Sequence, residues 1–347
     1  MPSSDRLVAV AAHGLAGSRT DLPATPLTDL EWFDLVQACL AADLAGFLVS
    51  AAAAGDLPTS PGQADELAAV WAEGEGLTQV VERRVVTMSS LLTAAAVDHR
   101  IVDGPARRLT YAGATVRHAR SARVLVSRAR LDDALALLGP APRAATGQPI
   151  ERRQRLVVLP AVPGLGALPS PGADDWAAAT TAADLFGSVA TVVIDERAIP
   201  VLTLGQQLVV TCVELCSAPV ASLVDVRDVA ELALSPDLDG RGTRRLAEAA
   251  GATDALAEGV ALAWSAFDLA DKTELSVWAL RMDGRRQAAS APRPSGSTTR
   301  VGLAQRVFGR APQPAAVPAA PGVAVAPMAR TASLSTGHAR PAGPTRR

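Results

Sequence analysis

The sequence predicts a mixed α/β fold, in which a segment of short strands and helices lies between two helical segments. Apolar residues recur at helical spacing before residue 97 and again after residue 202. Between these limits lie four short runs whose β-branched residues are typical of strands: 99–103, 122–126, 154–159 and 189–194. The chain has 347 residues, 49% of them hydrophobic, enough to bury the core of one large domain or of two ordinary ones.

The N-terminal helical segment is expected over residues 27–96. Thr28 and Glu31 have the spacing of a capping box, in which the threonine hydroxyl accepts from a free amide and the glutamate reaches back to the helix start. The apolar residues that follow predict one amphipathic helix over 29–54. Two further helices are expected at 63–73 and 76–96.

Residues 1–26 are expected to be a flexible N-terminus. Their apolar run is a poor match to a secretory signal peptide, because Asp5 lies in the charged region and His13 interrupts the run. The longest apolar stretch, Leu44 to Ala54, is about half of the ~20 residues that a spanning helix needs. We therefore expect neither secretion nor a membrane partner.

The α/β core is expected over residues 97–202 and the C-terminal helical bundle over 203–282. In the core, Gly104-Pro105 predicts a turn from the first strand into a helix, and the Pro- and Gly-rich residues 160–173 predict a loop. Further helical patterns follow at these positions: 131–138 in the core, and 223–234, 244–250 and 255–269 in the bundle.

Residues 283–347 are expected to form a disordered tail, because Pro, Ala, Gly, Ser and Arg offer too few large side chains to offset the entropy of ordering. Residues 281–347 carry a formal charge of +10, so residues 1–280 carry -12. An acidic body with a basic tail gives no strong signal for nucleic acid, although the tail could contact an anionic partner.

The cysteine and arginine content gives expectations about the cellular compartment of the protein and about the base composition of its genome. Cys39, Cys212 and Cys216 lie in helical patterns, and no further Cys or His has the spacing of a zinc site. Buried free thiols in a reducing cytoplasm are the expectation. Of 33 basic residues only Lys272 is a lysine, which together with the abundant alanine indicates the codon bias of a GC-rich bacterial genome rather than a function.

Three stretches of the chain carry a resemblance to a known family. The first is Val102-Asp103-Gly104-Pro105-Ala106, followed by Tyr111; the second is Arg117-His-Ala-Arg-Ser121-Ala-Arg123-Val-Leu-Val126; the third is Leu223-Val-Asp225-Val-Arg-Asp228-Val-Ala-Glu-Leu232. In order and spacing, residues 27–280 resemble a family of nucleotidyltransferases in the DNA polymerase β-like superfamily. The resemblance implies a minimal nucleotidyltransferase core with a small mixed sheet.

The resemblance also implies where catalytic groups should lie. In that superfamily two carboxylates at alternate positions of a strand hold Mg²⁺, which bridges the nucleoside triphosphate. Ser121 and Arg123 occupy those positions here, and Asp103 replaces the family's lysine. A third carboxylate is expected near 150–160, where Glu151 is the only acid. Serine is a poor ligand for Mg²⁺ and arginine repels it, so we expect a pseudoenzyme without catalytic residues, metal or cofactor.

The function predicted on this basis is binding or scaffolding, with a protein partner or a nucleotide-like anion. One alternative is an active nucleotidyltransferase that uses Mg²⁺ and NTP with other ligands, such as Asp98, Asp103 or Asp132. The other is an all-helical interaction protein unrelated to the family.

Relative to the pattern of that family, Asp103 and Arg123 have interchanged charges, and this has two explanations. Either they form a salt bridge between neighbouring strands, or Gly104, Arg117 and Arg123 form an anion site without metal. For single residues the simplest expectations are solvated charges for Arg117, Arg120 and Arg123 and for the Asp225–Asp228 helix face, and a packed strand-edge residue for His99.

Overall fold

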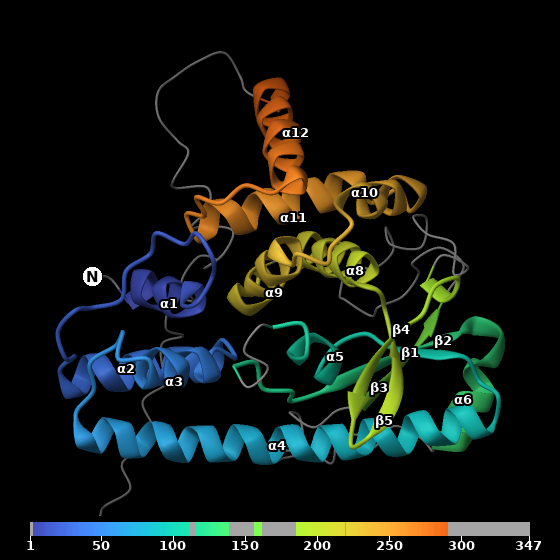
Figure 1. Cartoon of the computed structure of the whole chain (residues 1–347), viewed down its shortest axis with the longest axis horizontal. Coiled ribbons are helices and arrows are strands. Elements are labelled where there is room, and N and C mark those ends of the chain that lie inside the picture. The colour runs from blue at the N-terminus through green and yellow to red at the C-terminus, as the bar shows by residue number, and fades with distance from the viewer. Residues whose placement is uncertain (1–2, 112–115, 139–155, 162–184, 219, 291–347) are drawn as a thin grey trace, which may run out of the picture. The chain divides into compact units, whose positions relative to one another are not determined.

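The computed structural model describes residues 3–111, 116–138, 156–161, 185–218 and 220–290. It is a mixed α/β structure, as expected, in which helices surround a small sheet (Figure 1). Among the residues described, no helix combines the length and the apolar character that crossing a membrane requires.

The N-terminal part differs from expectation at three points. Residues 1–26 were expected to be flexible, but Ser3–Ala12 forms helix α1, whose Val10 and Ala11 are buried in the main core. The helix expected over 29–54 is divided into α2 and α3. The two helices expected at 63–73 and 76–96 are one long helix, α4. The bounds are Asp29–Ala41 for α2, Ala45–Ala53 for α3 and Pro61–Ala94 for α4.

Local sequence explains where these helices begin. The capping box expected at Thr28 and Glu31 is present at the start of α2. Ser60 and Gln63 form a second capping box at α4, with Pro61 at the first helical position, where its missing N–H costs nothing.

The sheet has the strand order β3-β2-β1-β5-β4. Strands β1 and β2 are antiparallel, with His99 opposite Val126, while β1 pairs with β5 and β2 with β3 in parallel. The bounds are His99–Ile101 for β1, Ala122–Ser127 for β2, Leu156–Ala161 for β3, Ala190–Ile194 for β4 and Arg197–Val201 for β5. This pairing excludes the all-helical alternative, and β5 is a strand that periodicity did not predict.

Among the described residues, two short helices belong to the core and five form the bundle. The core helices are α5 (Pro105–Arg108) and α6 (Leu131–Leu138). The bundle contains α8 (Leu204–Ser217), α9 (Leu223–Leu234), α10 (Gly240–Ala249), α11 (Thr253–Ala266) and α12 (Glu274–Ser290). The bundle therefore extends beyond its expected end at residue 282, and the rest of the expected tail, 291–347, lies outside the described residues.

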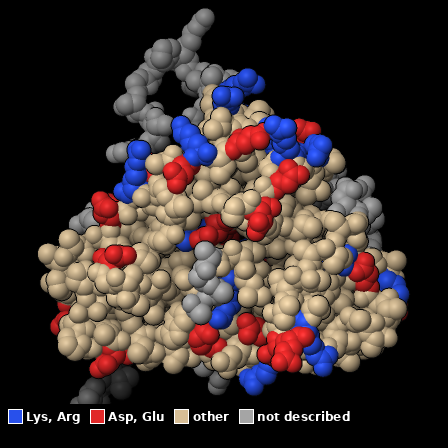
Figure 2. Space-filling model, in the orientation of Figure 1, with Lys and Arg blue, Asp and Glu red and all other residues tan. Residues whose placement is uncertain are grey.

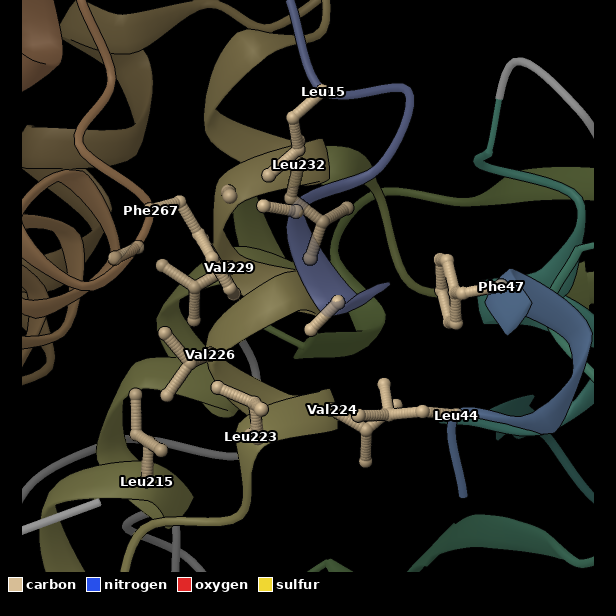
Figure 3. Close-up of a cluster of buried hydrophobic side chains, with 14 of the residues drawn as sticks. Leu15, Leu44, Phe47, Leu215, Leu223, Val224, Val226, Val229, Leu232 and Phe267 are labelled. Atoms are coloured by element: carbon tan, nitrogen blue, oxygen red, sulfur yellow. The ribbon is translucent and has the colours of Figure 1, made fainter. Parts of the chain in front are cut away.

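The two largest of three clusters of buried hydrophobic residues in the described chain organise these elements. In the main core, Phe47 and Leu44 of the N-terminal helices and Val229 and Leu232 of α9 belong to one buried cluster (Figure 3). In the second, Val85 of α4 packs with Val124 on the sheet. The N-terminal helices and the bundle thus share a core, while α4 also supports the sheet.

Candidate functional site

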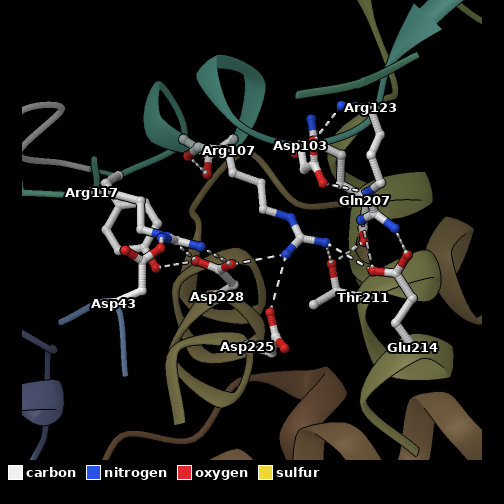
Figure 4. Close-up of polar contacts among 12 residues, drawn as sticks. Asp43, Asp103, Arg107, Arg117, Arg123, Gln207, Thr211, Glu214, Asp225 and Asp228 are labelled. Carbon is white, nitrogen blue, oxygen red and sulfur yellow. Dashed lines mark hydrogen bonds and ion pairs between the residues drawn. The ribbon is translucent and has the colours of Figure 1, made fainter. Parts of the chain in front are cut away.

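The site lies where the end of β1 and helix α5 meet helices α8 and α9 (Figure 4). Asp103 and Gly104 connect β1 to α5, and Gly104 adopts a φ of +64°, a left-handed conformation that favours glycine. A Cβ at this position would lie 2.1 Å from the carbonyl oxygen of Ser121. Chain geometry therefore accounts for Gly104, with no need for an anion bound at its backbone.

Arg123 lies between two carboxylates. Its backbone N–H donates to Asp103 Oδ1 at 2.7 Å, and its Nε donates to Asp103 Oδ2. Its terminal nitrogens donate to both carboxylate oxygens of Glu214 on α8, the NH2–Oε2 distance being 3.0 Å. The salt bridge expected between Asp103 and Arg123 is confirmed, and Glu214 is a second partner that the sequence did not predict.

Arg107 on α5 is the centre of the site. Its guanidinium donates to Asp228 Oδ2 at 2.9 Å, to Thr211 Oγ1 at 3.0 Å and to Glu214 Oε2 at 3.3 Å. Asp225 Oδ1 lies 3.6 Å from Arg107 NH1. Because Glu214 binds both arginines, the pair formed by Asp103 and Arg123 is continuous with the contacts of Arg107.

Arg117 extends the same set of contacts to the N-terminal helices. Its Nε lies 3.4 Å from Asp228 Oδ1, and its NH1 donates at 2.6 Å to Asp43, between α2 and α3. Arg120 Nε lies 2.7 Å from the other oxygen of Asp43. Tyr111 donates its hydroxyl to Asp228. The expectation of solvated charges is therefore wrong for Arg117 and Arg120, as it is for Arg123, because all three are paired with carboxylates.

We call these residues the central charge network. Its members are four arginines, five carboxylates and two hydroxyl groups: Arg107, Arg117, Arg120, Arg123, Asp43, Asp103, Glu214, Asp225, Asp228, Tyr111 and Thr211. Positive and negative groups nearly balance, which is how buried charges are tolerated in a medium of low dielectric constant.

Burial and pairing oppose each other in the pKa values of the most buried pair. Burial alone would raise the pKa of Asp228, whose side chain is 1% exposed, but Arg117 and Arg107 outweigh it and hold this pKa below its ordinary value. Burial would lower the pKa of Arg107, but Asp228 and Glu214 raise it above its ordinary value. Both residues are therefore charged at neutral pH.

Asp225 behaves differently from Asp228. Burial raises its pKa to about 6, and the attraction of Arg107 offsets this only in part. Its side chain is 38% exposed, against 1% for Asp228, and its distance to Arg107 is longer. Asp225 is thus the weakly held partner of Arg107, and its pKa lies close to neutral pH.

The network has clear chemical consequences. Each guanidinium group in it already faces a carboxylate, so an anion would have to displace one of them. Each carboxylate group likewise has an arginine beside it, and among the residues described no group of three or more His, Cys, Asp or Glu side chains could hold a metal ion.

The other ligands considered for an active enzyme do not converge. Asp98 pairs with Arg100 at the opposite end of β1 from Asp103, and Asp132 is exposed in the first turn of α6. Glu151 lies outside the described residues.

Two expectations about single residues have opposite outcomes. His99 is buried, as expected, with Nε2 2.8 Å from the hydroxyl of Ser89. The expectation of a solvated Asp225–Asp228 face is wrong for Asp228. A signal was present, because Asp228 lies between Val226 and Val229, which are on the buried side of α9.

Arg107, Asp43 and Glu214 were missed, because their partners are distant along the chain. For the thiols, Cys39 and Cys212 are buried as expected, but Cys216 is exposed.

Comparison with known proteins gives no match, neither to a family model nor to a curated protein nor to a solved structure.

Proposed function

We propose that the chain is a degenerate relative of the nucleotidyltransferases of the DNA polymerase β-like superfamily, which transfers no nucleotide and serves in binding or scaffolding. The family assignment rests on the motifs around Asp103, Tyr111 and Ser121–Val126. The mixed sheet, with its first two strands antiparallel, is compatible with the minimal core that such a family would have.

The observation that carries the proposal is the position of Arg123. It lies on β2, at the second of two alternate positions where the resemblance implies metal-binding carboxylates, and its guanidinium bridges Asp103 and Glu214. A cationic group bound by two carboxylates occupies the electrostatic position that a divalent cation would take. It supplies no Lewis acid and no activated hydroxyl, so transfer chemistry has no starting point here.

The direct test is a transfer assay with the full-length protein. The protein is incubated with each labelled NTP, Mg²⁺ or Mn²⁺, and a panel of acceptors that includes the protein itself. We expect no transfer of label. Transfer that disappears when a chelator is added would establish the active-enzyme alternative and contradict the proposal.

A gain-of-function variant tests the family relationship separately from the loss of activity. In Ser121→Asp/Arg123→Asp, two new carboxylates at the start of β2 would join Asp103 and Glu214. Only Glu214 would keep an arginine partner, Arg107, and a group of four acids with so little positive charge favours a hard divalent cation. We expect Mn²⁺ binding by calorimetry, together with a melting temperature that rises when Mn²⁺ is added.

The control is Ser127→Asp/Arg130→Asp, which changes the same residue types at the last residue of β2 and in the short 3-10 helix that follows it. It should bind no Mn²⁺. Equal binding by both variants, or by neither, would contradict the assignment of residues 121 and 123 to a former metal site.

The anion-site hypothesis is tested with labelled ATP in the presence of a chelator. Because Arg117 and Arg123 are paired with carboxylates, we expect no affinity that depends on them. Salt-sensitive ATP binding that is lost in Arg123→Ala, with stability unchanged, would instead favour the anion site.

A further inference from the structure

A second charged site lies on the bundle, formed by α10, the residues before α12, and α12 itself. It is a groove with a volume of about 450 Å³. Four cationic side chains line it, from Arg244, Lys272, Arg281 and Arg285. On the face shown in Figure 2, basic side chains gather over α10 and α12 with acidic ones between them.

The cations of this groove are not neutralised as those of the central charge network are. Lys272, Arg281 and Arg285 are exposed and have no carboxylate partner among the described residues. The one acid in the lining, Glu274, is 3.2 Å from Arg241. The groove therefore presents uncompensated positive charge on a body that is acidic overall, with -12 over residues 1–280.

The groove is also partly apolar. Val277, Trp278 and Met282 line it and are half-buried. They lie three or four positions from Arg281 and Arg285, so apolar and cationic groups share one face of α12. The guanidinium of Arg244 lies 5.7 Å from the centre of the Trp278 ring, which holds the ring beside the cations.

We propose that this groove binds an acidic segment of a partner protein, whose carboxylates pair with Lys272, Arg281 and Arg285 while an apolar side chain packs on Trp278 and Met282. Interface hot spots combine these residue types, an aromatic ring and arginine around an apolar centre. A nucleic-acid backbone would use the cations but would leave Val277 and Met282 without a partner. An amphipathic acidic segment uses both.

Two other occupants fit less well. The chain's own residues 291–347 are basic, so like charge opposes their binding in the groove. A phosphate at the start of α12 would compete with the side chains that cap this helix. The N–H of Thr273 donates to Ser276 Oγ at 2.9 Å and the N–H of Ser276 donates to Thr273 Oγ1 at 3.1 Å.

The test measures binding of the full-length protein to three fluorescein-labelled probes. One is an acidic amphipathic peptide with glutamates on one helical face and leucine and phenylalanine on the other. The second is a scrambled peptide of the same composition, and the third is a single-stranded oligonucleotide of equal charge. We expect salt-sensitive binding of the amphipathic peptide that is tighter than binding of the other two.

Two sets of variants locate the binding. Arg281→Glu/Arg285→Glu should weaken peptide binding about tenfold or more, whereas the matched change Arg83→Glu/Arg84→Glu, on an exposed part of α4, should alter it less than about twofold. Trp278→Ala should weaken it further, and Trp278→Phe should restore part of the loss.

Four results would overturn the proposal: no binding of the peptide, tighter binding of the oligonucleotide, equal losses in both charge variants, or self-association of the chain that Arg281→Glu/Arg285→Glu abolishes. The last would make a second copy the occupant. None of these variants touches Arg123, so a failure here is distinct from a failure of the proposed function.

Discussion

Arg123 shows how much one residue can decide. A carboxylate at this position would add to the negative charge of Asp103 and Glu214, whereas arginine neutralises both and joins β2 to the end of β1 and to α8. Both of its partners keep some exposure, so solvent screens the pair in part. The contribution of Arg123 to stability should therefore be large but below that of a fully buried ion pair.

We expect Arg123→Ala to lower the free energy of unfolding by about 2–3 kcal/mol, because two carboxylates would be left without their cation. Arg130→Ala is the matched control. Arg130 pairs with Asp133, three positions further along the chain, and this pair is exposed. Its removal should therefore lower the free energy of unfolding by less than ~0.5 kcal/mol. Urea unfolding, monitored by circular dichroism, measures the free energy of unfolding of both variants. Equal losses of stability would show that the Arg123 pair is no stronger than a surface pair.

Glu214 changes the result expected when the residues at positions 103 and 123 are exchanged. Without Glu214, Asp103→Arg/Arg123→Asp would restore much of the stability that either single change removes. With Glu214 present, the new aspartate at 123 would face it, and the backbone N–H of residue 123 would lose its acceptor. The exchange should recover little unless Glu214→Gln is added.

Asp225 gives a prediction about pH. Its folded pKa of about 6 exceeds the ordinary 3.8, so the folded state binds the proton more tightly than the unfolded state does. Ionisation of Asp225 therefore costs stability above pH 6, and this cost disappears as the pH falls from about 6 to about 4. The shift would correspond to ~3 kcal/mol, but the side chain is more than one-third exposed, and screening reduces this to about 1 kcal/mol.

Asp225→Asn should accordingly have a free energy of unfolding about 1 kcal/mol higher than the wild type at pH 7.5. Loss of the attraction to Arg107 reduces this gain. The difference between the two proteins should disappear near pH 4.5. Melting temperatures across this pH range measure it. Asp132→Asn, at an exposed position on α6, is the control and should show no such gap. A destabilised Asp225→Asn at pH 7.5 would mean that the pair with Arg107 outweighs burial.

At the scale of elements, helix α4 is longer than expected. Two helices were expected at 63–73 and 76–96, yet α4 continues without a break through Gly74 and Gly76. Gly74 is buried against His118, and a Cβ there would lie 2.2 Å from atoms of the imidazole ring. Gly76 is exposed, and a Cβ there would meet nothing within 4 Å.

The two glycines should therefore respond oppositely to the same substitution. Gly76→Ala should stabilise the protein by about 0.5–1 kcal/mol, because alanine favours the helix. Gly74→Ala gains the same propensity but must displace His118, so we expect a net loss of about 1–3 kcal/mol. Thermal unfolding of the two variants compares them directly, and a stabilised Gly74→Ala would show that the His118 ring moves aside at little cost.

At the scale of the whole molecule, Asp228 connects three parts of the described chain. Through Arg117 it is linked to Asp43 between α2 and α3, through Arg107 to α5 in the core, and it lies itself on α9 of the bundle. The main hydrophobic core also joins the N-terminal helices to the bundle. The parts that the sequence suggests as separate segments should thus unfold together.

We expect Asp228→Asn to lower the free energy of unfolding by about 3–5 kcal/mol, because Arg107 and Arg117 would lose a buried counter-charge. The loss should appear as one cooperative transition, seen equally by circular dichroism and by tryptophan fluorescence. Asp228→Asn with an early, separate transition in one of the two signals would contradict the coupling of the three parts.

The sequence alone determined the features that depend on neighbours along the chain. The capping box at Thr28, the strand character of residues 122–126 and the helix at 223–234 follow from local spacing, and all three are present. The pairing of Asp103 with Arg123 was also predictable, because opposite charges on neighbouring strands can meet.

Tertiary structure decided what depends on residues far away. The His118 ring leaves no room for a side chain at Gly74, and Asp228 is paired with arginines more than 100 positions from it. Glu214 and Asp43 became partners of Arg123 and Arg117 only because packing of the helices brings them there. Burial sets both the cost of a charge and the strength of its pairing, and burial is a property of the packed molecule rather than of any segment.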